Sequence, residues 1–384
     1  MSDLEKKKYW IALHRVPGVG AVSFRKLLTA FESPENVFAA SESSLKSIPG
    51  LSEKTIGNIL HFAFPDSVKK ELDAIDREQV NVLTWDDSTY PALLRNIFDP
   101  PPVLYVKGRL APAHDVTVSV VGSRKSSTYG RTVAESLCRE LSVKGVTIIS
   151  GMARGIDSAA HRGALQAGGV TIAVLGCGVN VVYPPENSRL YHAILERGSV
   201  ISELPISAKP DRRNFPARNR IISGMSLGTV VVEAGLKSGA LITADMALDQ
   251  GRDVFAVPGN INSVCSQGTN WLLKQGAALV DCADDVLSAC SPDLSREVHQ
   301  DLQEAMQFSP APASRASVTH DTETASLSSQ ETLVLRELGQ EPLHIDEIGL
   351  RTQLSSAAVS SSLILLEMKN LIRQSAGKMF SLAK

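Results

Sequence analysis

Short runs of β-branched residues alternate with helix-forming segments from about residue 81 to residue 290. This alternation is typical of strand–helix–strand crossovers and predicts a mostly parallel sheet with helices on its faces. Two runs, around Val82 and at Val103–Val106, are expected to add accessory strands. The main strands are expected at Val116–Val121, Thr147–Ser150, Thr171–Gly176, Val200–Glu203, Thr229–Glu233 and Asp253–Val257. The segment is therefore predicted to be an extended Rossmann-like α/β domain.

Residues 1–80 are predicted to be helical, with turn signals at Val16–Gly20 and Ile48–Ser52. Each signal precedes a helix-forming stretch, which is typical of a pair of helix-hairpin-helix units. In such hairpins the backbone N–H groups at the turn can hold a DNA phosphate without reading the base sequence. The alternative is a purely structural bundle that uses Pro-Gly turns.

The C-terminal part contains a predicted linker at 291–330 and a predicted winged helix at 331–384. Ser, Ala, Pro and Thr dominate Phe308–Gln330, which is typical of a flexible linker. The helix after Ser355 is a candidate recognition helix for duplex DNA, but its small and nearly uncharged residues favour a contact with a protein partner or an auxiliary duplex-sensing role at least as well. The winged helix is expected from helices at Glu331–Leu338, Ile345–Thr352 and Ser355–Lys369, followed by a hairpin that turns at Gly377.

Charge and cysteine content limit the class of protein. The formal net charge of the 384 residues is −2, so any contact with nucleic acid must come from a local basic patch. Five cysteines without a C-x-x-C pair predict reduced thiols and no metal site. Apolar runs are only strand-length, so a soluble, cytoplasmic protein without a membrane segment is expected.

A cluster of arginine and asparagine lies at Asp211–Ser226. Guanidinium groups are planar bidentate donors that suit phosphates, and amides can hydrogen-bond a base or a sugar. The cluster therefore predicts a phosphorylated ligand. Its members are Arg212, Arg213, Asn214, Arg218, Asn219 and Arg220.

Loops that follow the predicted strands carry residues suited to anions. They are Gly122–Ser127, Ser150–Asp157 and Glu233–Thr243. A fourth loop, Gly176–Gly178, is a weaker signal, and the residues that follow it are interpreted as a turn before a helix capped by Asn187. Because the carboxyl ends of parallel strands share one edge, these loops are expected to converge on one pocket. No dinucleotide or P-loop motif is present, so no cofactor is predicted.

An enzyme is the rival interpretation of the same edge. Asp157 and His161 lie four residues apart on a predicted helix and are either an acid/base pair or a cap with its partner. Glu233 at a strand end is a possible general base. A nucleotide hydrolase of the lysine-decarboxylase-like Rossmann group would use such a glutamate, although the chain lacks that group's Pro-Gly-Gly loop. A pure protein scaffold is the third alternative.

Taken together, these motifs resemble the DNA-processing protein A family (DprA, also called Smf). The resemblance covers nearly the whole chain and depends on Val120–Arg124, Ser150–Asp157 with His161, Phe215–Gly224, Lys237–Gly239 with Thr243, and Ala256–Gly259. It implies a sterile-alpha-motif-like N-terminal domain, an extended Rossmann domain that binds single-stranded DNA, and a C-terminal winged helix.

The resemblance also implies a function without catalysis. Proteins of this family bind incoming single-stranded DNA during natural transformation, protect it, displace single-strand binding protein and load the RecA recombinase, usually as homodimers formed through the Rossmann domain. Carried onto this sequence, Arg124, Arg218 and Arg220 would hold phosphates. The complete expected DNA-binding set is Gly122, Ser123, Arg124, Ser150, Gly151, Arg154, Phe215, Arg218, Asn219, Arg220, Lys237, Ser238, Gly239 and Thr243.

Two details limit this transfer. Pro185 follows Tyr183-Pro184 where the family commonly has a basic residue, and Ile206-Ser207 follows Leu204-Pro205 where the family often has glycine. Aromatic residues form only 5% of the chain, which favours a charged pocket over a groove of stacked rings. Phe215 and Tyr129 are the expected ring partners of the bases, and the alternative for Phe215 is a buried core anchor.

Overall fold

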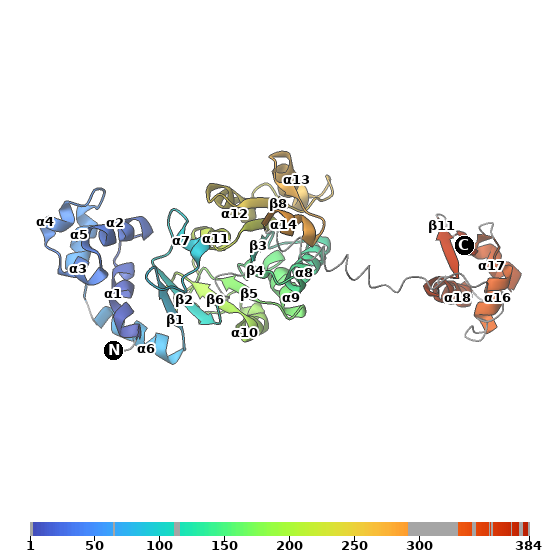
Figure 1. The fold of residues 1–384 in the computed structure, drawn as a ribbon, viewed down its shortest axis with the longest axis horizontal. Helices are drawn as coiled ribbons and strands as arrows, with labels where there is room; N and C mark the ends of the chain where they lie inside the picture. Colours follow the sequence, from blue (N-terminus) through green and yellow to red (C-terminus); the bar gives the residue numbers. More distant parts are fainter. Residues whose placement is uncertain are drawn as a thin grey trace, which may run out of the picture. The chain divides into compact units, whose positions relative to one another are not determined.

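The computed structural model describes residues 3–63, 66–110, 116–290, 329–339, 343–352, 354, 356–369, 371–375 and 379–382. The chain divides into two compact units, residues 1–307 and 308–384 (Figure 1). Among the described residues, no helix is both long and apolar enough to cross a membrane. The predicted boundaries at 80/81, 290/291 and 330/331 stay predictions.

One sheet organises the first unit. Its described strands follow the order β1-β2-β6-β5-β4-β3-β7-β8-β9, and β1 and β2 run antiparallel to their neighbours while the rest are parallel. The predicted extended Rossmann-like fold is therefore confirmed. The strands are β1 (Asn81–Thr84), β2 (Val103–Gly108), β3 (Thr117–Val121), β4 (Thr147–Ser150), β5 (Thr171–Val174), β6 (Ser199–Ser202), β7 (Gly228–Val231), β8 (Asp253–Ala256) and β9 (Ala278–Leu279).

Alternate side chains of each strand pack on opposite faces of this sheet. On β3, Val118 and Val120 join the apolar cluster of one face, and Val121 joins that of the other. The first face is covered by α8 (Thr128–Val143), α9 (Ile156–Gln166), α10 (Ser188–Arg197) and α14 (Ala283–Cys290). The second is covered by α7 (Ala92–Arg95), α11 (Asn214–Gly224), α12 (Gly239–Asp249) and α13 (Gln267–Lys274) (Figure 1).

Six short helices precede the sheet and share an apolar core with its accessory strands. Trp10, Phe24 and Trp85 pack together, with ring centroids 5.3 to 6.1 Å apart. Lys7 donates to the Val82 carbonyl at 2.7 Å, which joins α1 to β1. The helices are α1 (Asp3–Arg15), α2 (Ala21–Phe31), α3 (Pro34–Ala39), α4 (Glu42–Lys46), α5 (Glu53–Leu60) and α6 (Asp66–Arg77).

Both predicted helical hairpins turn at a glycine in the left-handed region. Gly18 has φ +92° and Gly50 has φ +81°, a conformation that glycine adopts without strain. The second hairpin differs from the first at its helix start, because the Ser52 hydroxyl accepts a hydrogen bond from the Thr55 N–H and caps α5. The residue at α2 that corresponds to this cap is Gly20, which has no side chain to offer. Whether either hairpin holds a phosphate stays a prediction.

The second unit is a small helical domain with a three-stranded sheet in the order β10-β12-β11. The predicted winged helix is confirmed, with β10 as an additional strand. Its elements are α16 (Ser329–Glu337), β10 (Leu343–His344), α17 (Ile345–Thr352), α18 (Ser356–Met368), β11 (Ile372–Ser375) and β12 (Met379–Leu382). Two predicted features, the cap at Ser355 and the turn at Gly377, lie outside the described residues. So does the predicted linker up to residue 328, while its last two residues belong to α16, which begins at Ser329.

Candidate functional site

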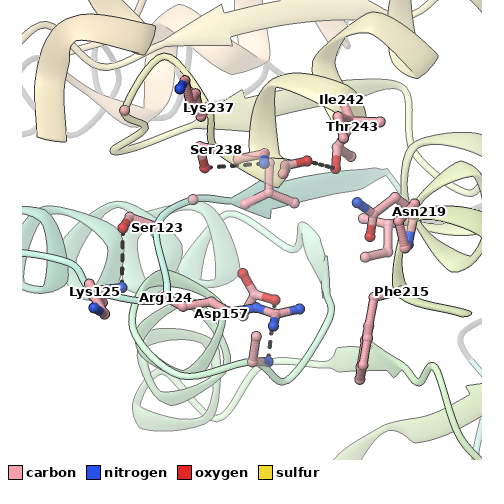
Figure 2. Close-up of a pocket in the computed structure, with 18 of the residues that line it drawn as sticks. Ser123, Arg124, Lys125, Asp157, Phe215, Asn219, Lys237, Ser238, Ile242 and Thr243 are labelled. Carbon is pink, nitrogen blue, oxygen red and sulfur yellow. Dashed lines mark hydrogen bonds between the residues drawn. The ribbon is translucent and has the colours of Figure 1, made fainter. Parts of the chain in front are cut away.

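A cavity of about 980 Å³ lies where the strand order reverses, between β3 and β7. Open α/β sheets bind their ligands at such a point, because the helices that follow the two strands leave in opposite directions. The cavity is lined by the loop after β3, the loop after β7 and the start of α11 (Figure 2). Among the charged residues that line it, the cations are Arg124, Lys125, Arg212, Arg218 and Lys237, against one carboxylate, Asp157.

Glu233 holds the loop after β3 in place. Its backbone carbonyl accepts from the Ser123 N–H at 2.7 Å, and its carboxylate accepts from both the N–H and the hydroxyl of Ser127, at 2.8 and 2.5 Å. Arg124 and Lys125, between these two points, remain exposed at the cavity. A carboxylate with both oxygens bonded to one serine is poorly placed to abstract a proton, which weakens the general-base interpretation of Glu233.

The loop after β4 is folded tightly against the loop after β3. Gly155 has φ +79°, and the Ile156 N–H donates to the Ser123 carbonyl at 3.3 Å. Asn187 occupies the predicted cap position of α10 but makes no side-chain capping bond. Instead, its amide donates to the Met152 carbonyl and the Ser158 hydroxyl, both at 2.8 Å. The predicted position of Asn187 at the N-cap of α10 is confirmed, while its side chain supports this loop and makes no capping bond to the helix.

Arg218 forms the inner wall of the cavity and is only 4% exposed. Its guanidinium donates to the carbonyls of Gly151 and Val174, and therefore connects the ends of β4 and β5. Burial lowers the pKa of Arg218 to about 10, and the nearby Asp157 carboxylate opposes that shift. Burial raises the pKa of Asp157, against the effect of Arg218. The inner wall is thus a buried Arg–Asp arrangement, and the more accessible charge lies on the loops.

Phe215 closes the cavity on the side opposite the loop after β7. Its ring lies 5.0 Å from the Arg124 guanidinium, and both side chains are seen in Figure 2. The Tyr183 ring lies 5.6 Å from it. The ring also covers Gly176, where an added Cβ would lie 2.9 Å from it. Phe215 is half-buried and lines the cavity, so it is a wall residue as well as a packing residue. Tyr129 lies elsewhere, with its hydroxyl donating to the Pro258 carbonyl at 3.1 Å.

The start of α12 supplies the third wall. Ser238 caps this helix by accepting from the Ala240 N–H at 3.3 Å, and the Thr243 hydroxyl donates to the Gly239 carbonyl. Lys237 is exposed beside them. Of the predicted site residues, those that the structure brings to the cavity are Gly122, Ser123, Arg124, Phe215, Arg218, Asn219, Lys237, Ser238, Gly239 and Thr243.

Four predicted site residues lie away from the cavity lining. The Ser150 hydroxyl is buried and donates to the Val120 carbonyl at 2.6 Å, and Gly151 lies under the Arg218 guanidinium. Arg154 is paired with Glu186 on the surface, and Arg220 is paired with two carboxylates. The sequence prediction did not include the apolar rim formed by Leu236, Ile242 and Val264. Ile242 lies three residues after Gly239, the first residue of α12. This closeness to the predicted Lys237–Gly239 loop is the one sequence signal that favoured a place for Ile242 at the cavity.

His161 and Asp157 do not form the acid/base pair that their spacing suggested. The Thr171 hydroxyl gives its proton to the Ile148 carbonyl, so His161 must donate through Nδ1 to Thr171, at 2.7 Å. Nε2 of His161 is buried and has no hydrogen-bond partner within the described part of the chain. Burial, and secondarily the charges of Arg218 and Arg162, lower the pKa of His161 to about 3.

This buried histidine predicts an acid-sensitive fold. Because the pKa of His161 is about 3 in the folded chain and ordinarily 6.5, the unfolded chain binds more protons between these values. Stability is therefore lost as the pH falls below 6.5. We expect the wild type to lose about 2 kcal/mol more than His161→Asn between pH 6.5 and 5 in urea unfolding, since the asparagine keeps a donor toward Thr171. Parallel pH profiles for the two proteins would contradict this expectation.

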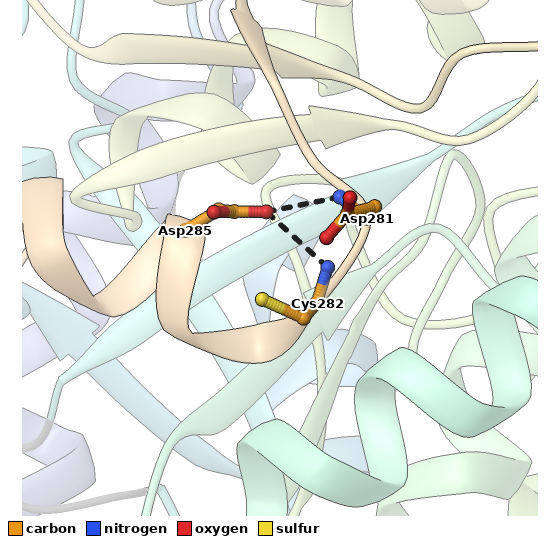
Figure 3. Close-up of side chains that lie close together, drawn as sticks. All are labelled: Asp281, Cys282 and Asp285. Atoms are coloured by element: carbon orange, nitrogen blue, oxygen red, sulfur yellow. Dashed lines mark hydrogen bonds between the residues drawn. The ribbon is translucent and has the colours of Figure 1, made fainter. Parts of the chain in front are cut away.

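Asp281, Cys282 and Asp285 lie close enough together to suggest a metal site (Figure 3). However, one Asp285 oxygen accepts from the N–H groups of Asp281 and Cys282, at 3.0 and 3.3 Å. This is the capping arrangement expected at the start of α14. The proximity of the three residues is therefore explained by helix capping.

A doubly wound sheet with a cation-lined crevice at its switch point is typical of proteins that bind nucleotides or nucleic acid. Comparison with known proteins narrows this class. The family profile described as DNA recombination-mediator protein A matches residues 81–291. The DprA winged helix domain profile matches 318–378, and a SAM-like helix-hairpin-helix tandem matches 11–63.

Individual relatives agree with these profiles. Protein Smf of Synechocystis is 34% identical over 390 residues, which cover 97% of this chain and 98% of the relative. Protein Smf of Escherichia coli is 39% identical over 308 residues, 80% of this chain and 79% of the relative. The crystal structure of DprA from Streptococcus pneumoniae has a TM-score of 0.65 and 36% identity, and the match covers 73% of this chain and 97% of that structure. The chain belongs to the DprA/Smf family of DNA-processing proteins.

Proposed function

We propose that this protein binds single-stranded DNA in the cavity between β3 and β7 and acts on it without catalysis. The supporting observation is the convergence of exposed cations from three separate segments, Arg124 and Lys125, Arg212, and Lys237, on one opening. Such side chains bind phosphates regardless of base sequence. We propose that the DNA strand is held by those predicted residues that line the cavity. Outside the lining are Ser150, Gly151, Arg154 and Arg220, whose proposed effect on DNA binding is indirect.

We further propose that the bound strand is protected during natural transformation and handed to RecA, with displacement of single-strand binding protein in the cytoplasm. The family description as a DNA recombination mediator supports a role in recombination, to which this proposal adds the individual steps. A homodimer through the sheet domain is proposed from β9, the last strand in the described order of the sheet, because Leu279 of β9 and Trp271 of α13 are both exposed. Unpaired strand edges with apolar neighbours are suited to pairing between chains.

Fluorescence anisotropy with labelled oligo-dT tests the proposal. The purified chain is expected to bind the oligonucleotide, and affinity should fall steeply between about 50 and 200 mM salt because phosphate contacts release counterions. Binding that is absent at low salt would reject the proposal and leave a protein scaffold. Release of free base from a panel of nucleoside monophosphates would instead support the hydrolase alternative.

The proposed transfer to RecA needs its own measurement. RecA assembly on oligonucleotides coated with single-strand binding protein should be accelerated by this chain and not by bovine serum albumin at equal concentration. Equal assembly rates would remove the RecA part of the proposal while leaving DNA binding intact.

A further inference from the structure

Arg220 points away from the cavity although it belongs to the same Arg-Asn-Arg motif as Arg218 and Asn219. Residues two apart on an α-helix are about 200° apart around its axis, so Arg218 and Arg220 cannot face the same ligand. Arg218 and Asn219 line the cavity and Arg220 does not. The spacing of the motif therefore separates its two arginines into different tasks.

Arg220 is held by two carboxylates on the opposite side of α11. Its Nε lies 3.0 Å from the carboxylate of Asp99, in the segment between α7 and β2. Its Nη2 is paired with the carboxylate of Glu203, which directly follows β6. The side chains of Arg220 and Glu203 are 13% and 14% exposed. The charge of Arg220 is thus balanced by two carboxylates of the chain itself, which weakens its attraction for a phosphate.

The same cluster continues into two neighbouring helices. His14 of α1 donates through Nε2 to the backbone carbonyl of Glu203 at 2.8 Å. At the other end, the Gln250 amide donates to the backbone carbonyl of Arg220 at 3.0 Å, next to the last turn of α12. Arg220 and Glu203 thus connect α11 with the N-terminal helices, with β6 and with α12, whose N-cap is Ser238.

We propose that Arg220 is a positioning residue, which binds no phosphate and fixes the rotation of α11 through Glu203 so that Arg218 and Asn219 face the cavity. This inference rests on the proposed binding of single-stranded DNA for its affinity readout. Losing the ion pair allows α11 to turn or shift, and the Arg218 bonds to the ends of β4 and β5 are then strained. Affinity falls although no contact with DNA has been removed.

The sign of the Glu203→Gln effect distinguishes positioning from phosphate binding. If Arg220 held a phosphate, neutralising Glu203 would free the arginine and strengthen DNA binding. If Arg220 positions α11, Glu203→Gln weakens binding to oligo-dT about tenfold, a difference near 1.4 kcal/mol. Asp211→Asn is the matched control, because Asp211 is an exposed carboxylate paired with Arg213 upstream of the same helix. Its affinity should be unchanged or slightly higher.

Salt dependence gives a second discrimination. Removing one phosphate contact makes the slope of log affinity against log salt less negative by about 0.7 on a single strand. We expect Arg124→Ala to show that change, whereas Arg220→Ala should lower affinity with an unchanged slope. The double variant Glu203→Gln/Arg220→Ala should be no weaker than Arg220→Ala, because both changes break the same pair. A reduced slope for Arg220→Ala with tighter binding by Glu203→Gln would overturn the proposal.

Hydrogen exchange of free protein separates this inference from the DNA-binding proposal. Amides of residues 214–224 should exchange faster in Glu203→Gln and Arg220→Ala than in wild type and Asp211→Asn, with no DNA present. Unchanged exchange in both variants would overturn the positioning role, whatever the DNA result. Faster exchange in both variants, together with a wild type that fails to bind oligo-dT, would support the positioning role and reject only the proposed function. Should Arg220→Ala fail to fold, Glu203→Gln, which keeps the side-chain volume, carries the test.

Discussion

Replacing Arg124 and Lys237 together with alanine is expected to lower affinity for oligo-dT at least 100-fold, or about 3 kcal/mol, at low salt. Both side chains are exposed at the cavity and come from different loops, so neither can substitute for the other. The slope of log affinity against log salt should become less negative by about 1.4, because two phosphate contacts are lost. Anisotropy titrations at four salt concentrations measure both quantities.

Lys46→Ala is the control for this double variant. Lys46 is an exposed cation on α4, paired with Glu42 at 2.7 Å, and does not line the cavity. Its removal changes the net charge but should leave the affinity within about twofold of wild type, since exposed pairs contribute little. Equal losses in Lys46→Ala and the double variant would mean that binding depends on the overall charge of the chain and would contradict the assignment of the cavity.

Gly155→Ala is expected to have the largest effect on stability among the single changes proposed. Gly155 has φ +79°, and an added Cβ would lie 2.2 Å from the Ser123 carbonyl oxygen and 3.0 Å from that of Arg124. Because both obstacles are backbone atoms, the loop after β3 must move. We expect a loss of about 3 to 4 kcal/mol in urea unfolding, from left-handed strain and overpacking, together with weaker DNA binding.

Gly145→Ala provides a matched comparison for this change. Gly145 has φ +81°, and an added Cβ would meet no atom within 4 Å. Its substitution should therefore cost only the strain of the left-handed conformation, about 1 to 2 kcal/mol, and should leave DNA affinity unchanged. If the two alanine variants unfold at the same urea concentration, the close packing between the loops after β3 and β4 is not essential.

The sheet was predictable because its strands are buried on both faces. Continuous runs of β-branched residues, such as Thr147–Ser150, differ in pattern from the helical segments between them. The predicted bounds of that strand match those of β4. β9 was missed, since its two residues, Ala278 and Leu279, are exposed at the sheet edge and form no such run. The fold class thus follows from burial, whereas an exposed edge strand has no pattern to detect.

The site was predictable at the level of loops and less so at the level of side chains. Strand-end loops rich in Gly, Ser and Arg converge because parallel strands share an edge, and most of the predicted residues line one cavity. Residue type alone could not tell an accessible arginine such as Arg124 from Arg218, which bonds to main-chain carbonyls. Helical spacing within the Arg-Asn-Arg motif was the available signal that its arginines differ.

A structure of the full chain with a short oligo-dT tests the central claim most directly. The distance from the Arg124 guanidinium nitrogens to the nearest phosphate oxygen should be about 2.7 to 3.0 Å, with the strand in the cavity between the loops after β3 and β7. DNA bound elsewhere, for example on the winged helix or the helical hairpins, with every phosphate beyond hydrogen-bonding distance of Arg124 and Lys237, would contradict the account.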